Sequence, residues 1–227
     1  MYAFTFERPA ALADAVKLAE AGGKPLAGGQ TLLASMKLRL SAPEQLVDLG
    51  GIKELTGIRK DGDAIVIGAM SRHLDVANNA EVKAAFPALA DLASRIGDRQ
   101  VRAMGTLGGS VANNDPAACY PSAVLATGAT VVTSKREIAA DDFFQGLFTT
   151  ALEEGELITA IRFPIPKRAV YESCARRPRI SRWSACSSRS TTAVCAWPSP
   201  ARATACSGTR GSRMRSTRAS PRPPRPA

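Results

Sequence analysis

The fold and the function of this chain are best predicted from residues 105–116, which read GTLGGSVANNDP. An earlier stretch, residues 27–33, reads AGGQTLL and likewise places adjacent glycines next to a small hydroxyl residue. Because glycine has no Cβ, backbone N–H groups there can approach a ligand closely while the hydroxyl donates alongside. Two such stretches together indicate a site that binds the oxygens of a pyrophosphate group. Glycine pairs also mark ordinary turns, and on these residues alone that alternative stays open.

The residues around the earlier stretch predict a small α/β unit over residues 1–55. Short apolar runs predict its strands, and Pro9 opens an amphipathic helix that the glycines at 22 and 23 end. The expected elements are a strand over 2–6, a helix from Pro9, a strand over 24–27, a helix over 32–40 and a strand over 45–48. The first glycine stretch then lies in a loop between strand and helix.

Residues 56–168 predict a larger, strand-rich α+β unit. Asp61-Gly62-Asp63 indicates the turn of a hairpin, and Pro87 interrupts a helical pattern. The expected elements are strands over 58–60 and 64–68, helices over 71–77, 81–96 and 120–127, and strands over 130–133, 136–138 and 157–163. The second glycine stretch is expected as a loop. A ligand held between the two units is the natural use of this arrangement.

The positive charge of the chain is confined to its end. The formal net charge is +10, but residues 1–173 carry 18 Lys and Arg against all 20 acids, a net of −2. The last 54 residues carry 12 Arg, no Lys and no acid, a net of +12. A strongly basic average would indicate nucleic acid or an anionic membrane as partner. In this chain the positive charge lies only in the last 54 residues, so that indication applies to this segment alone.

Three interpretations of residues 169–227 are open. The Arg, Ser and Pro content allows a disordered basic tail or an Arg-rich arm that binds nucleic acid. The third is translation out of frame from a GC-rich gene, since residues 180–207 shifted by one nucleotide have the apolar, turn and apolar pattern of a β-hairpin. We expect this third case: a disordered, out-of-frame remnant of a C-terminal α+β domain, with no nucleic-acid partner.

The cysteines and the N-terminus predict a cytoplasmic protein without a metal site. Four of the five cysteines lie at positions 174, 186, 195 and 206, with no Cys-x-x-Cys pair, and His73 is the only histidine. Such spacing fits neither zinc nor an iron–sulfur cluster. Residues 1–9 lack a basic segment followed by an apolar one, and no run reaches membrane-spanning length. We therefore expect no signal peptide and no membrane span.

Four motifs occur in an order that resembles one family. They are LAGGQTLL at residues 26–33, IGA at 67–69 with Arg72-His73 after it, IGDRQVRAMGTLGGS at 96–110 and NDPAA at 114–118. The chain resembles the FAD-binding medium subunit of the molybdenum hydroxylases, the family of carbon monoxide dehydrogenase and xanthine dehydrogenase. The resemblance covers about residues 1–168, and the shifted-frame hairpin resembles the start of the family's third domain.

The resemblance implies a two-subdomain α+β FAD-binding fold and an oxidoreductase subunit. In the family a molybdenum-cofactor large subunit oxidises the substrate, an iron–sulfur small subunit passes the electrons on, and the FAD subunit delivers them to NAD or another acceptor. An inactive flavin-binding fragment is the alternative. FAD would rest its pyrophosphate mainly on N–H dipoles. The implied cofactor-binding positions are Ala27, Gly28, Gly29, Gln30, Thr31, Leu32, Thr106, Leu107, Gly108, Gly109, Ser110, Asn113 and Asp115.

Three further residues are weighed against the family pattern. Asp115 is expected to orient its loop or to accept from a ribityl or ribose hydroxyl. Many relatives carry an acid where this chain has Cys119, and because a thiol is a weak acceptor we expect Cys119 to pack inward as a small helix residue. His73 is expected to be structural or to cap a helix, so no catalytic residue is predicted.

Overall fold

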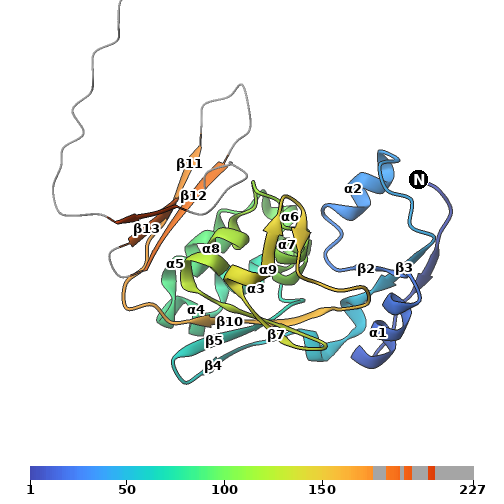
Figure 1. Cartoon of the computed structure of the whole chain (residues 1–227), viewed down its shortest axis with the longest axis horizontal. Helices are drawn as coiled ribbons and strands as arrows, with labels where there is room; N and C mark the ends of the chain where they lie inside the picture. The colour runs from blue at the N-terminus through green and yellow to red at the C-terminus, as the bar shows by residue number, and fades with distance from the viewer. Residues whose placement is uncertain (176–182, 190–191, 196–203, 208–227) are drawn as a thin grey trace, which may run out of the picture.

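A computed structural model of the chain describes residues 1–175, 183–189, 192–195 and 204–207. Figure 1 shows three parts in chain order: an N-terminal unit built on a small parallel sheet, a larger central unit of helices and antiparallel strands, and a sheet that follows the central unit. The first two parts are the α/β and the α+β units that the sequence predicts.

The N-terminal sheet is parallel and carries one helix on each face. Its strands, in sheet order, are β1 (Thr5–Glu7), β3 (Gln45–Asp48) and β2 (Lys24–Leu26), and its helices are α1 (Leu12–Glu20) and α2 (Leu32–Lys37). Ala15 and Ala19 of α1 pack with Val47, whereas Met36 of α2 packs with Leu46. Successive strand residues point to opposite faces, so the two helices cover opposite sides of β3.

Two short 3-10 turns lead into a five-stranded antiparallel sheet. The turns are η1 (Leu49–Gly51) and η2 (Lys53–Leu55), and the strands in sheet order are β4 (Ile58–Asp61), β5 (Ala64–Gly68), β10 (Ile158–Pro164), β6 (Thr130–Thr133) and β7 (Glu137–Ala139). All five residues of β5 are buried, which explains their unbroken apolar run. The last central strand, β10, lies between β5 and β6.

Helices cover this sheet, and local sequence signals begin and end them. They are α3 (His73–Asn78), α4 (Ala80–Ala85), α5 (Pro87–Ser94), α6 (Arg99–Met104), α7 (Leu107–Asn113), α8 (Cys119–Thr127) and α9 (Ala140–Phe143), followed by the hairpin of β8 (Phe144–Gly146) and β9 (Thr149–Thr150). Pro87 stands at the first turn of α5, which confirms the predicted interruption. Gly128 ends α8 in the left-handed conformation.

The prediction of a loop at the second glycine stretch is wrong. Residues 107–113 form α7, and α6 precedes it where no helix was expected. Asp98 caps α6 by accepting from the Val101 N–H, and Thr106 caps α7 by accepting from the Gly109 N–H. Burial of Leu107 and Val111, one helical turn apart, outweighs the poor helix propensity of the glycines.

The described residues beyond the central unit form an antiparallel sheet, while the expectation of an out-of-frame, disordered tail stays a prediction. The strands of this antiparallel sheet are β11 (Tyr171–Ala175), β12 (Trp183–Arg189), β13 (Thr192–Cys195) and β14 (Thr204–Ser207). Backbone pairing needs no apolar period, so the composition did not indicate it. Tyr171 is buried in the central core. The out-of-frame interpretation also concerns residues 176–182, 190–191, 196–203 and 208–227, which lie outside the described residues.

Candidate functional site

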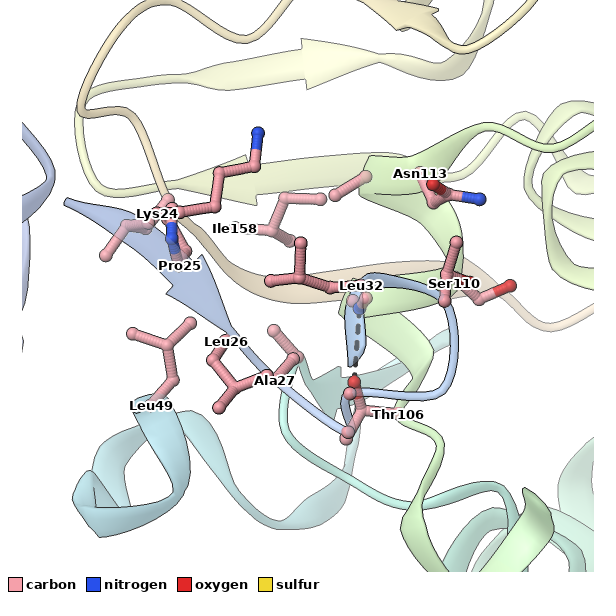
Figure 2. A pocket seen from close by; sticks show the side chains of 18 of the residues that line it. Lys24, Pro25, Leu26, Ala27, Leu32, Leu49, Thr106, Ser110, Asn113 and Ile158 are labelled. Carbon is pink, nitrogen blue, oxygen red and sulfur yellow. Dashed lines mark hydrogen bonds between the residues drawn. The ribbon is translucent and has the colours of Figure 1, made fainter. Parts of the chain in front are cut away.

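One cleft of about 800 Å³ receives both glycine stretches. It lies between the N-terminal and central units, and every predicted cofactor-binding residue except Leu107 lines it. Leu107 is fully buried in the central core instead, because it is the first residue of α7 and points into the protein. Figure 2 shows Lys24 and Pro25 on one side of the cleft and Ser110 and Asn113 on the other.

The glycines allow parts of the chain to approach one another, which was not the role predicted for them. A Cβ on Gly28 would overlap the Met104 carbonyl oxygen and would lie 2.7 Å from the Gly105 Cα. A Cβ on Gly108 would lie 2.5 Å from the Ala69 Cβ. Gly28 therefore lets the two glycine stretches touch, and Gly108 lets α7 pack on the end of β5.

The first stretch has a run of backbone donors without protein acceptors. Within the described residues, no protein acceptor binds the N–H groups of Gly28, Gly29, Gln30, Thr31 or Leu32. Intrahelical bonding resumes at the next residue, whose N–H donates to the Gly29 carbonyl at 3.0 Å. Consecutive free N–H groups at a turn into a helix form a concave site for an anion.

The second stretch differs, because its backbone donors are already used. The Leu107 N–H donates to the Ser71 carbonyl at 3.0 Å, and the Gly108 N–H to the Ala69 carbonyl at 2.8 Å. Gly109 donates to its own cap, Thr106. What α7 presents to the cleft is therefore side chains, namely the hydroxyl of Ser110 and the amide of Asn113. The prediction that the second stretch offers N–H dipoles is therefore wrong for residues 107–109, whereas for the first stretch it stays a prediction.

Comparison with known proteins settles the family. Residues 2–166 match the family described as the FAD binding domain in molybdopterin dehydrogenase. The chain belongs to this family. It is 41% identical over 184 residues to the carbon monoxide dehydrogenase medium chain of Afipia carboxidovorans, and 37% identical over 182 residues to the glyceraldehyde dehydrogenase medium chain of Sulfolobus acidocaldarius. Each match covers 77% of this chain but only 64% and 65% of those relatives.

Solved structures give the same result for the fold. A Cu,Mo-CO dehydrogenase crystal structure superposes with a TM-score of 0.77 and 37% identity, covering 85% of this chain and 72% of that one. The quinoline 2-oxidoreductase of Pseudomonas putida 86 superposes with a TM-score of 0.78 and 30% identity, over 86% of this chain and 73% of that one. FAD is thus the cofactor of this FAD-binding domain, and its cleft, with five free N–H groups, fits a dinucleotide.

The end of the cleft beside β2 is apolar. Sequence analysis did not single out the residues there, because their apolar side chains resemble those of any core strand. They are Pro25, Leu26, Leu49, Leu157 and Ile158. Lys24, at the start of β2, is the only lysine or arginine among the described residues that line the cleft. A flat apolar ring system is the ligand that such a surface accepts.

A buried carboxylate shapes the segment that lines this end. Glu156 accepts from the Thr133 hydroxyl at 2.6 Å, from the Arg136 Nε at 3.2 Å and from the Glu153 N–H at 2.9 Å. Burial alone would raise the pKa of Glu156, but these hydrogen bonds outweigh it and lower the pKa. Glu156 is ionised at neutral pH and holds residues 153–156 against the cleft.

His73 lies at the base of the cleft and is buried. Its backbone N–H donates to the Gly105 carbonyl at 2.9 Å, so α3 begins against the glycine stretch. Burial, with the Arg102 cation second, lowers the pKa of His73 to about 4, so the imidazole is neutral at pH 7. Its Nδ1 has no hydrogen-bond partner among the described residues, and its ring lies 5.3 Å from that of Tyr120.

Asp115 and Cys119 differ in their position relative to the cleft. Asp115 lines the cleft, and its Oδ1 accepts from the Ala117 N–H at 2.8 Å, which forms the turn before α8. Cys119 lies outside the cleft lining and packs partly buried against the central core, where the Tyr171 hydroxyl donates to its Sγ at 3.1 Å. Burial raises the pKa of the Cys119 thiol.

The described residues contain neither a membrane-spanning helix nor a metal-binding cluster. Among them, no helix is both long and apolar enough to cross a bilayer. In the same part of the chain, no three His, Cys, Asp or Glu side chains gather as they would around a metal ion.

Proposed function

We propose that this chain is the FAD-binding electron-transfer subunit of a molybdenum-containing hydroxylase or dehydrogenase. It carries electrons from the iron–sulfur clusters of a small partner subunit to NAD or another acceptor, while a large molybdenum-cofactor subunit oxidises the substrate. The observation that carries the proposal is the run of free N–H groups over residues 28–32 inside a cleft of dinucleotide size. Membership of the family supplies the identity of the dinucleotide.

In the proposed binding mode, each part of FAD contacts cleft residues whose chemistry matches it. The N–H groups of Gly28 to Leu32 and the Thr31 hydroxyl hold the pyrophosphate oxygens. Pro25 and Ile158, at the apolar end, hold the adenine. The side chains of Ser110 and Asn113, on the opposite side of the cleft (Figure 2), and the carboxylate of Asp115, just after α7, bind the ribityl chain and the polar edge of the flavin.

The residues of this chain position FAD and take no part in proton transfer. When bound, FAD supplies reversible acceptance and release of electrons, and the protein tunes its potential. With a pKa lowered to about 4, the imidazole of His73 is a weak proton acceptor, and the thiol of Cys119 lies outside the cleft, so we assign neither a catalytic role. Relatives named for carbon monoxide and for glyceraldehyde share this domain. We therefore propose that the partner subunit selects the substrate.

Titration of the purified full-length chain with FAD tests this proposal. We expect one FAD per chain, measured by the visible absorption of bound flavin. Thr31→Val should bind FAD more weakly than the control Thr130→Val, whose side chain lies on β6 outside the cleft lining. Reduced iron–sulfur partner subunit should then bleach the bound flavin. Bound flavin that the partner cannot reduce would favour the inactive-fragment alternative. A colourless chain with salt-dependent DNA affinity would contradict the proposal.

A further inference from the structure

The hairpin of β8 and β9 presents two exposed apolar side chains, one of which lines the cleft. Leu147 and Phe148 form its tip and are 59% and 61% exposed. Phe148 lines the cleft, whereas Leu147 does not. The backbone of Phe148 has a φ of 55°, in the left-handed region that a bulky side chain rarely adopts. Such a conformation persists only where surrounding contacts enforce it, and it is typical of functional sites.

Asn114 enforces this conformation through three hydrogen bonds. Its Nδ2 donates to the Gly146 carbonyl at 2.6 Å and to the Thr149 carbonyl at 2.8 Å. Its own carbonyl accepts from the Phe148 N–H at 3.2 Å. Asn114 is buried, ends α7 and is itself left-handed, with a φ of 44°. The tip is therefore a rigid extension of α7 rather than a free loop.

We propose that Phe148 is a positioning residue that packs against the flat face of the isoalloxazine ring of FAD, and that Asn114 holds it there. The inference rests on the proposed function. It names a contact for the flavin end of the cofactor within the described part of the chain.

Two observations select the isoalloxazine over the adenine. The Phe148 N–H donates to the Asn114 carbonyl, so Phe148 lies beside Asn113 at the end of α7, whereas Pro25 of β2 lies on the opposite side of the cleft (Figure 2). Electron exchange with a partner also requires the flavin near the surface, where the exposed tip lies. An aromatic side chain against an aromatic ring adds attraction beyond the buried area.

Substitutions at the tip test the inference through FAD affinity and flavin fluorescence. Phe148→Ala should raise the FAD dissociation constant about tenfold and should increase the fluorescence of the bound flavin, because a stacked aromatic ring quenches it. Phe148→Tyr should restore both, and Phe148→Leu should restore affinity in part but not the quenching. Leu147→Ala, equally exposed but outside the cleft, is the matched control. The ADP dissociation constant should stay unchanged in every variant.

Asn114→Ala provides an independent variant. It should reproduce the fluorescence change of Phe148→Ala while Phe148 itself is present, because the tip loses its anchor. If Phe148→Ala binds FAD with wild-type affinity and fluorescence, the inference is wrong even though the proposed function stands. If the wild-type chain binds neither ADP nor FAD, the proposed function fails first. If the wild-type chain binds ADP but not FAD, the proposed function fails as well, because the cleft then does not hold the flavin.

Discussion

Replacement of Gly28 by alanine should force the two glycine stretches apart. Its new Cβ would overlap the Met104 carbonyl oxygen and would lie 2.7 Å from the Gly105 Cα. Both obstacles are backbone atoms, so no side-chain rotation relieves the overlap. The first stretch has to move away from the start of α7, and its free N–H groups at residues 28–32 move with it.

The size of the effect follows from the distances. Carbon atoms pack best at about 3.5–4.0 Å, so the Gly28 stretch has to shift by roughly 1 Å. Overpacking of this kind usually destabilises a protein by about 1–3 kcal/mol. We expect a loss of stability in that range and a larger loss of FAD affinity, because the N–H groups of residues 28–32 lose their common orientation.

Urea unfolding and FAD titration of Gly28→Ala measure both effects. Gly146→Ala is the matched control, since its Cβ would meet only the Thr149 Cβ at an ordinary 3.9 Å. The control should retain the stability of the wild type. The reasoning is refuted if Gly28→Ala unfolds at the wild-type urea concentration and binds FAD as the wild type does.

Three further predictions follow from the structure. Burial lowers the pKa of His73 to about 4, so between pH 6.5 and 4 the folded state binds fewer protons at this residue than the unfolded state. The contribution of His73 to stability is therefore nearly constant above about pH 6.5 and falls by about 2 kcal/mol from pH 7 to pH 5. Urea unfolding at both pH values should show this loss in the wild type and a smaller one in His73→Gln. Glu156→Gln should cost about 2 kcal/mol, measured by the same method, because it leaves buried donors unpaired, whereas the exposed Glu154→Gln should cost nothing measurable. Sequencing of the gene near codons 168–180 should reveal an inserted or missing base; an intact frame with a stable, homogeneous product would disprove the frame interpretation.

The strands of the N-terminal sheet and of the five-stranded sheet, and most helices, were predictable because their signals are local, whereas the hairpin of β8 and β9 was not expected. The hairpin turn at residues 61–63, the break at Pro87 and the left-handed Gly128 each act through the backbone of one or two residues. The N-terminal order of strand and helix also followed from apolar spacing. Leu40, the last residue of the helix expected over 32–40, is 78% exposed because α2 already ends at Lys37.

The identity of the cleft residues was predictable in large part, but their roles were not. Glycine spacing identified both stretches, yet a sequence cannot distinguish a glycine that admits a ligand from Gly28, which admits Met104. The same limit applies to Leu107, where burial formed a helix inside an expected loop. Pro25 and Ile158 come from elements more than 130 residues apart, and only the fold brings them to one wall.

The crystal structure of the full-length chain with bound FAD tests the central proposal most directly. We predict that the pyrophosphate oxygens lie within hydrogen-bonding distance, about 2.7–3.2 Å, of N–H groups in residues 28–32. The adenine should lie beside Pro25 and Ile158. A pyrophosphate that instead contacts the start of α7 without touching residues 28–32, or FAD bound outside the cleft, would contradict it.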